Sequence, residues 1–245
     1  MRTWLIALAL AFVAVPAVVG VGCGGGGEEG PSATAVPVDR PTLEATLRSV
    51  ALTLADLPAG FVLEEPGEVF TDNEEAAETD PEGKQAALAR LDEWGRLLGY
   101  EATYMTNDPL GTFIRGGTAM VTVSLNIFQT SEGAAAGIEW GREVAADPSQ
   151  SIALFPGVIS IEGEPMSFPS IGDETLAATF TGTLRPEAED AELEVDVDFV
   201  AHMVAIRQGR ATAHIIVAAI GGATPGQEVE DIIRTLDERL AQALQ

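Results

Sequence analysis

The chain contains a single cysteine, Cys23, in 245 residues. Without a second thiol no disulfide can form within the chain, so the fold must be stabilised by packing alone. Small secreted scaffolds that depend on several disulfides are thereby excluded. The lone thiol also needs its own explanation, because it is otherwise a reactive group without a partner.

Positive charge is also scarce. Thirteen Lys and Arg residues stand against 38 Asp and Glu residues, so the formal net charge is −25. Such a surface repels phosphate backbones and anionic lipid headgroups, so we expect no nucleic-acid partner and no membrane binding through a basic patch. A cationic ligand or a basic partner is compatible with this charge, but a surface that keeps the protein soluble is the favoured interpretation.

The usual sequence marks of catalysis and metal binding are missing. The chain has no H-E-x-x-H, paired-cysteine, G-x-S-x-G or phosphate-loop motif. Its two histidines, His202 and His214, flank a predicted hairpin turn at Gln208-Gly209, which would pair residue 203 with 214 and residue 202 with 215. The two rings then point to opposite faces of the sheet and cannot share a metal. We therefore expect no metal, no cofactor and no enzyme.

The N-terminus has the pattern of an export signal. Arg2 supplies a positive charge, an apolar run follows from Trp4 to Val19, and small residues precede Cys23. A basic start, a short apolar core and small residues at the cleavage point predict a signal peptide over residues 1–22. An uncut transmembrane helix is the alternative, because the apolar run is close to the length that spans a bilayer. Both interpretations place the rest of the chain on the outer side of the cytoplasmic membrane.

Cys23 lies where bacterial lipoproteins carry their modified cysteine. Val21, Gly22 and Cys23 resemble the end of a lipobox, although Gly20 stands where that family usually has Leu or Val. The resemblance implies that the thiol of Cys23 takes a diacylglycerol and that the residue becomes the new N-terminus. Residues 23–41 are rich in Gly, Glu, Pro and Ala and cannot form a core, so we predict a lipid-anchored flexible linker.

Residues 42–245 are predicted to form one extracytoplasmic α+β domain with an antiparallel sheet. Residues 118–128 alternate apolar and polar side chains, as a strand with one buried face does. Residues 224–243 carry apolar side chains at helical spacing, which predicts an amphipathic terminal helix. Residues 81–98 are predicted to form another helix, which Gly99 ends.

Two apolar segments should form the centre of the sheet. Residues 199–206 and 211–220 are apolar on both faces, so other elements must cover both faces. Hairpins followed by amphipathic helices are typical of an antiparallel sheet with helices packed on it. The order strand, strand, helix occurs in both halves of the domain, which suggests two similar ββα halves.

Three short stretches resemble known bacterial envelope proteins. They are residues 54–61 (LADLPAGF), residues 171–174 (IGDE) and residues 206–210 (IRQGR). Together with the terminal helix they are similar to lipoproteins of actinobacterial type and to the sensor-like extracellular domain of some mycobacterial serine/threonine kinases. The resemblance covers most of residues 50–243 and implies a tethered α+β domain with a candidate ligand cleft and no catalytic residues. Those sensor domains typically carry disulfides, which this chain cannot form.

Aromatic side chains are the candidates for a ligand-binding surface. Trp140, Tyr100 and Tyr104 are predicted to line a cleft, for instance for a glycan or a lipid. Trp94 falls on the apolar stripe of its predicted helix and is therefore assigned to the core. Trp140 is harder to place on the inner face of its helix, so we expect it to be the more exposed of these two tryptophans.

Four acidic residues at every second position are the candidate for cation binding. Glu192, Glu194, Asp196 and Asp198 would share one face of a strand, with successive carboxylates roughly 6–7 Å apart. Calcium requires several oxygens that converge on one point, which a straight row does not supply without help from a loop. A solvated strand face, or a sheet edge protected by charge, is the favoured interpretation.

These features favour a non-enzymatic lipoprotein whose domain binds a small ligand or an envelope protein at the outer membrane face. An envelope enzyme of hydrolase type is the alternative, and it would need carboxylates such as Asp173 and Glu174 where a loop meets a strand. A purely structural envelope protein without a pocket is the third alternative. An apolar cleft would favour binding, whereas two carboxylates of raised pKa in one cleft would favour an enzyme.

Overall fold

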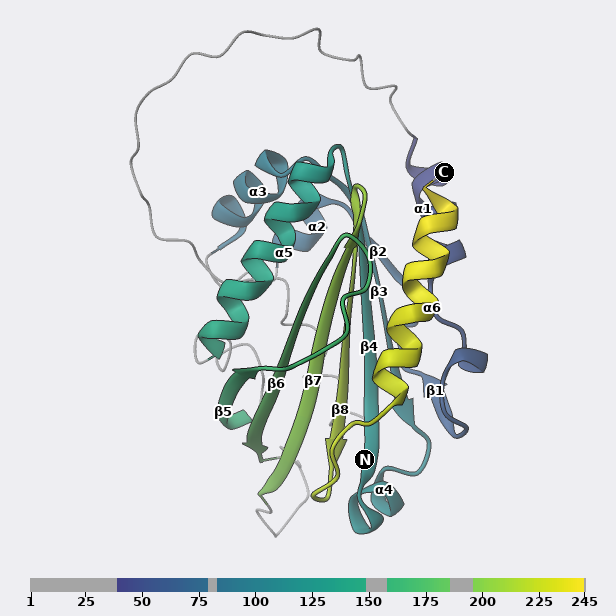
Figure 1. The fold of residues 1–245 in the computed structure, drawn as a ribbon, viewed down its shortest axis with the longest axis vertical. Helices are drawn as coiled ribbons and strands as arrows, with labels where there is room; N and C mark the ends of the chain where they lie inside the picture. Colours follow the sequence, from purple (N-terminus) through teal and green to yellow (C-terminus); the bar gives the residue numbers. More distant parts are fainter. Residues whose placement is uncertain (1–38, 79–82, 149–157, 186–195, 245) are drawn as a thin grey trace, which may run out of the picture.

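The computed structural model describes residues 39–78, 83–148, 158–185 and 196–244. Within these residues eight strands form one antiparallel sheet with helices packed on it, which confirms the predicted α+β fold (Figure 1). The strands are β1 (Phe61–Leu63), β2 (Val69–Thr71), β3 (Arg96–Thr106), β4 (Gly117–Phe128), β5 (Val158–Pro165), β6 (Glu174–Leu184), β7 (Val197–Gln208) and β8 (Ala211–Ile220). The helices are α1 (Arg40–Val50), the short 3-10 helix η2 (Leu54–Asp56), α2 (Asn73–Ala77), α3 (Lys84–Glu93), α4 (Pro109–Arg115), α5 (Ser131–Ala146) and α6 (Glu228–Ala243).

The sheet follows the order β1-β3-β4-β8-β7-β6-β5, and β2 pairs with β3 on the same edge as β1. The hairpin strands β7 and β8 lie in the middle of the sheet, as their apolar character predicts. Val204 and Ile215, which face each other across this hairpin, are fully buried. Because such strands are apolar on both sides, they require cover on both faces of the sheet.

The two faces of the sheet pack against different helices. The first face, which carries Val123, Leu125 and Ile215, forms one hydrophobic cluster with α1 and α6. The second face carries Met203 and Ile216 and is covered by α5. In Figure 1, α5 (teal) and α6 (yellow) lie on either side of the central strands. The order strand, strand, helix therefore recurs as β3-β4-α5 and β7-β8-α6, but the two helices cover opposite faces.

The terminal helix matches its predicted apolar stripe. Its buried side chains are Val229, Ile232, Ile233, Leu236 and Leu240. These positions repeat at intervals of three and four residues, so they form one face of the helix. That face packs on the first face of the sheet, where it completes the larger hydrophobic cluster.

The turn between β7 and β8 is Gly209-Arg210, one residue later than predicted, which shifts the pairing of the two strands by two residues. Gln208 pairs with Ala211, so His214 faces Ala205 and His202 faces Val217. The predicted pairing of residue 203 with 214 is therefore wrong. Because the shift is an even number of residues, each side chain keeps its face. His202 lies on the first face and His214 on the second.

The predicted helix over residues 81–98 is too long at its C-terminal end. Helix α3 ends at Glu93, and β3 already begins at Arg96. The reason is Gly95, whose φ of +65° is a left-handed conformation that ends a helix and that glycine adopts without strain. Leu98, the last residue of the predicted helix, is a strand residue buried in the first-face cluster.

No helix in the described part of the chain is long and apolar enough to cross a membrane. The predicted signal peptide (residues 1–22) and Cys23 lie outside the described residues, as does most of the predicted linker.

Candidate functional site

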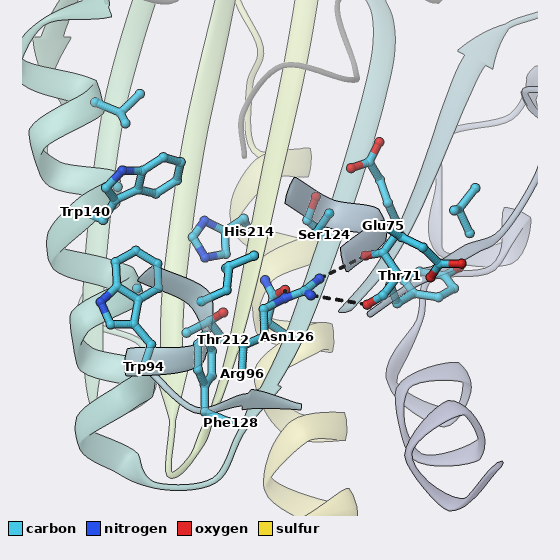
Figure 2. A pocket seen from close by; sticks show the side chains of 18 of the residues that line it. Thr71, Glu75, Trp94, Arg96, Ser124, Asn126, Phe128, Trp140, Thr212 and His214 are labelled. Carbon is cyan, nitrogen blue, oxygen red and sulfur yellow. Dashed lines mark hydrogen bonds between the residues drawn. The ribbon is translucent and has the colours of Figure 1, made fainter. Parts of the chain in front are cut away.

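A cavity of about 200 Å³ lies on the second face of the sheet. Strands β2, β3, β4, β7 and β8 form its floor, and helices α2, α3 and α5 form its walls and roof. Figure 2 shows Trp94 and Trp140 on one side of it, His214 and Arg96 near the middle, and Thr71 on the far side. The cavity therefore joins a mostly aromatic wall to a polar floor.

The polar floor results from strand alternation. In β4 the residues Val121, Val123, Leu125 and Ile127 point to the first face, so Thr122, Ser124 and Asn126 between them point to the second. In the register Glu101 of β3 lies directly opposite Ser124, and Ser124 lies directly opposite His214 of β8. Residues opposite each other in an antiparallel sheet have Cβ atoms roughly 4.5–5.5 Å apart. Glu101, Ser124 and His214 thus form a continuous row across three strands, which we call the polar row.

Burial changes the protonation of both titratable members of the polar row. It raises the pKa of Glu101 to about 7, and the hydrogen bond with Ser124 opposes this rise. Burial also lowers the pKa of His214 to about 4, so its imidazole is neutral at physiological pH. No ion pair to Glu101 is found in the described part of the chain. The row therefore combines a neutral base with a carboxyl group that titrates near neutral pH.

Arg96 holds the far side of the cavity together. Its side chain is 8% exposed. Its guanidinium donates to Asn126 Oδ1 at 2.8 Å, to Thr71 Oγ1 at 2.9 Å, and to Thr71 O and Asn73 Oδ1 at 3.2 Å. Burial lowers its pKa to about 10, so it stays charged at neutral pH. Arg96 thus ties β2 and the start of α2 to β4 and uses four of its five N–H groups to do so.

The opposite wall of the cavity is aromatic. Trp94 follows α3 and Trp140 comes from α5, and their ring centroids lie 6.2 Å apart. The guanidinium of Arg90 lies 5.7 Å from the Trp94 ring centroid and 5.2 Å from the Trp140 ring centroid. Helix α5 comes close to the sheet at Gly141, where a Cβ atom would lie 3.3 Å from Leu176 Cδ2 and 3.9 Å from His214 Cε1. Small residues on α5 therefore bring Trp140 over the polar row.

The structure separates the three aromatic residues predicted to share a cleft. Trp140 lines the cavity, and so does Trp94, which was assigned to the core; both are half-buried. Tyr100 borders the cavity, but its ring packs edge-on against Phe70 in the first-face cluster. Tyr104 is also buried on the first face, where its hydroxyl donates to the carbonyl oxygen of Leu52. From Leu98 to Tyr104 the even-numbered positions of β3 belong to the first-face cluster, which the aromatic content of the sequence does not reveal.

The structure describes only two of the four acidic residues considered for cation binding. Glu192 and Glu194 lie outside the described residues. Asp196 pairs with Arg185, whose Nε lies 2.8 Å from Oδ1, and this hydrogen bond lowers the pKa of Asp196. Asp198 accepts a hydrogen bond from Thr183 at 3.0 Å. Among the residues that the structure describes, no group of three or more His, Cys, Asp or Glu side chains could hold a metal ion.

Asp173 and Glu174, the carboxylates of the enzyme alternative, lie outside the cavity. Asp173 accepts hydrogen bonds from the backbone N–H of Gly209 at 2.8 Å and from Arg207 at 3.1 Å. Glu174 pairs with Arg142 at 3.1 Å and with Arg207 at 3.5 Å. These contacts attach the start of β6 to the turn between β7 and β8. Both carboxylates thus have a structural partner already.

The sequence alone does not single out the polar row as a site. The alternation over residues 118–128 shows which positions are polar, but the polar face of a strand is normally exposed to solvent. Periodicity does not show that a helix covers this face. Glu101 provides the one available signal, because a carboxylate within a strand whose neighbours are buried is unusual unless it has a role.

No protein-family model matches this chain, and no curated protein matches it by sequence. Among solved structures it is similar to the extracellular domain of PknH from Mycobacterium tuberculosis, with a TM-score of 0.45 and 10% sequence identity. The match covers 84% of this chain and 98% of that chain. At this level of similarity the match defines neither a shared site nor a shared ligand.

Proposed function

We propose that this protein is a membrane-tethered, extracytoplasmic lipoprotein whose α+β domain binds a small ligand in the cavity on the second face of the sheet, without catalysing a reaction. The cavity of about 200 Å³ is the observation that carries the proposal. An apolar cavity of about 150 Å³ is large enough to bind benzene. Apolar walls with a few converging polar groups are typical of small-molecule sites. The cavity contains one carboxyl of raised pKa, Glu101, rather than the pair that would favour an enzyme.

The tether is supported by the export signal and by the position of Cys23. We expect the membrane fraction of cells that produce the protein to contain a mature species that begins at Cys23 and carries added acyl mass. Intact mass spectrometry of the protein and of its Cys23→Ser variant measures this directly. An unprocessed mass that begins at residue 1 would contradict the lipid anchor and would indicate a transmembrane helix instead.

Ligand binding can be followed by the fluorescence of the protein itself. The sequence has three tryptophans, and apart from Trp4 in the predicted signal peptide they are Trp94 and Trp140, which both line the cavity. A panel of single-ring amines, alcohols and carboxylates should contain compounds that change this fluorescence in a saturable way. The Ser124→Leu variant fills the middle of the cavity floor and should weaken their binding by at least about 10-fold, because pocket contacts of this size are worth 1–3 kcal/mol.

Ser160→Leu is the matched control, because Ser160 is an exposed residue of β5 outside the cavity. This variant should bind the panel as the unaltered protein does. If no compound of the panel gives a saturable change, or if Ser124→Leu binds as well as Ser160→Leu, the cavity is not a binding site and the proposed function is wrong.

A further inference from the structure

We propose that the cavity binds a compact organic cation, whose ammonium group pairs with the carboxylate of Glu101 and whose apolar part lies against Trp94 and Trp140. The proposal rests on the proposed function, because it names the chemical class of ligand for the same cavity. It follows from the hydrogen-bonding groups that the cavity leaves open, from its aromatic wall and from its charge.

The open groups on the cavity floor are hydrogen-bond acceptors. In the described part of the chain, Ser124, directly opposite on β4, is the one side chain whose hydrogen bonding influences the pKa of the Glu101 carboxyl. An ionised carboxylate can accept about four hydrogen bonds, so most of this capacity is unused. His214 is neutral at physiological pH because burial lowers its pKa to about 4, and a neutral imidazole has one acceptor nitrogen. A ligand for this floor must therefore be a donor.

The strongest donor of the cavity is already occupied. Arg96 gives four of its N–H groups to Thr71, Asn73 and Asn126 at 2.8–3.2 Å. Its guanidinium has neutral oxygens around it, and the negative charge of Asp72 stabilises its charged form. An anionic ligand would have to compete with these contacts, whereas a cation at Glu101 displaces none of them. This asymmetry favours a cation over an anion.

The aromatic wall is suited to the apolar part of the ligand, because Arg90 already supplies a cation beside both tryptophan rings. The guanidinium of Arg90 already lies within 6 Å of both ring centroids, at 5.7 Å from Trp94 and 5.2 Å from Trp140. Indole rings attract cations through the negative charge density on their faces. The same rings supply the apolar surface against which the body of a small amine can pack.

The net negative charge of the protein also favours a cationic ligand. The formal net charge of −25 raises the concentration of cations near the protein and lowers that of anions. Glu75 adds a carboxylate to the cavity wall on the side of α2. Within the cavity, the pKa of Glu101 is raised to about 7 because its ionised form is poorly solvated there. A bound cation would supply the missing counter-charge.

Three probes of nearly equal size test the charge preference: 2-phenylethylammonium, 2-phenylethanol and phenylacetate. Calorimetric titration of the full-length protein in a neutral detergent at pH 8.5 gives the dissociation constant of each. We expect 2-phenylethylammonium to bind at least about 10-fold more tightly than the other two, because a hydrogen bond to a charged group is worth about 1.5–3 kcal/mol.

The Glu101→Gln variant removes the charge but keeps the size of the side chain. It should weaken binding of 2-phenylethylammonium by about 10- to 100-fold and leave binding of 2-phenylethanol unchanged. Glu162→Gln is the matched control, because it removes one negative charge from an exposed position of β5 outside the cavity. It should bind all three probes as the unaltered protein does.

Binding of the cation should also depend on pH, because it needs the ionised form of Glu101. The other titratable side chains that line the cavity are Arg96, Glu75, His214 and Tyr100, and Arg90 lies against the two tryptophans. Burial lowers the pKa values of Arg96 and His214 to about 10 and about 4 and raises the pKa of Tyr100, so Arg96 stays charged and the other two stay neutral between pH 5.5 and 8.5. With a pKa of about 7 for Glu101, the affinity for 2-phenylethylammonium should fall by about 30-fold between pH 8.5 and pH 5.5. Binding of 2-phenylethanol should not change in this way.

Several outcomes would overturn the proposal while leaving the proposed function intact. They are equal binding of all three probes, preferential binding of phenylacetate, and unaltered binding of 2-phenylethylammonium by Glu101→Gln. In each of these cases the cavity still takes a ligand. If none of the three probes binds, the cation proposal is wrong. If the fluorescence panel then also fails to distinguish Ser124→Leu from Ser160→Leu, the proposed function is wrong as well.

Discussion

Replacing Glu101 with glutamine should raise the free energy of unfolding at pH 8 by up to about 3 kcal/mol, because each unit of pKa shift corresponds to about 1.4 kcal/mol. The pKa of this carboxyl is raised from 4.5 to about 7 by burial. At pH 8 the folded protein must therefore hold an ionised carboxylate in a poorly solvating cavity, whereas the unfolded chain holds it in water. Glutamine has no such cost and preserves a hydrogen-bonding partner for Ser124.

The stability that Glu101→Gln gains over the unaltered protein should increase with pH. Between pH 4.5 and pH 7 the folded state keeps a proton on Glu101 that the unfolded state has released, so stability falls as the pH rises through this window. His214 has the opposite effect, because its pKa of about 4 is lowered and it binds its proton preferentially in the unfolded state. His214 is present in both the unaltered protein and Glu101→Gln. The difference between their free energies of unfolding therefore reports on residue 101 alone.

Urea unfolding at several pH values between 4 and 8 measures this difference. The curves for the unaltered protein and for Glu101→Gln should converge below about pH 4.5, where the carboxyl is protonated in both the folded and the unfolded state. Glu162→Gln serves again as the control, since its carboxylate is exposed, and it should follow the unaltered protein at every pH. A constant difference between Glu101→Gln and the unaltered protein across the whole range would contradict the assignment of a raised pKa to Glu101.

Replacing Gly133 with alanine should lower the free energy of unfolding by about 3 kcal/mol, the upper end of the usual cost of overpacking. A Cβ atom at this position would lie 1.9 Å from the backbone carbonyl oxygen of Trp94. Backbone cannot rotate out of the way as a long side chain can, so the first turn of α5 must move away from the end of α3. That movement would also break the hydrogen bond from the Gly133 N–H to the side chain of Thr130, which caps the helix.

Gly137 provides a control one turn further along the same helix. A Cβ atom there would meet the Phe128 ring at 3.3 Å, which a small ring movement relieves. Alanine is favoured over glycine within a helix by about 1 kcal/mol, so Gly137→Ala should be neutral or slightly stabilising. Thermal unfolding of both variants gives the comparison. If Gly133→Ala is as stable as Gly137→Ala, the close contact between α5 and the end of α3 is not a constraint on the fold.

Much of the fold is predictable because side-chain periodicity reports which residues share a face. The alternation over residues 118–128 and the helical stripe of residues 224–243 correspond to β4 and α6. The two-sided apolar character of residues 199–206 and 211–220 correctly places β7 and β8 in the middle of the sheet. The end of α3 was predicted too late, because an apolar leucine after Gly95 fits a helix or a strand equally well in a short window.

The candidate site could not be predicted in the same way. Periodicity shows that Thr122, Ser124 and Asn126 share a face, but it does not show that α5 covers this face. The register that brings Glu101 and His214 to either side of Ser124 involves strands more than 100 residues apart in the chain. Likewise, the separation of Tyr100 from Trp140 depends on which face of β3 is turned towards α5.

Composition and local pattern by themselves determine the acidic charge, the dependence on packing without disulfides, the predicted export signal with Cys23, and the α+β class. Tertiary structure alone decides that a polar strand face is buried, that a carboxyl group there titrates near neutral pH, and that Trp140 of α5 and Trp94, which follows α3, line the same cavity. The physical reason is that charge, periodicity and turn preference are properties of neighbouring residues. Solvation of a side chain instead depends on whatever distant segment packs against it.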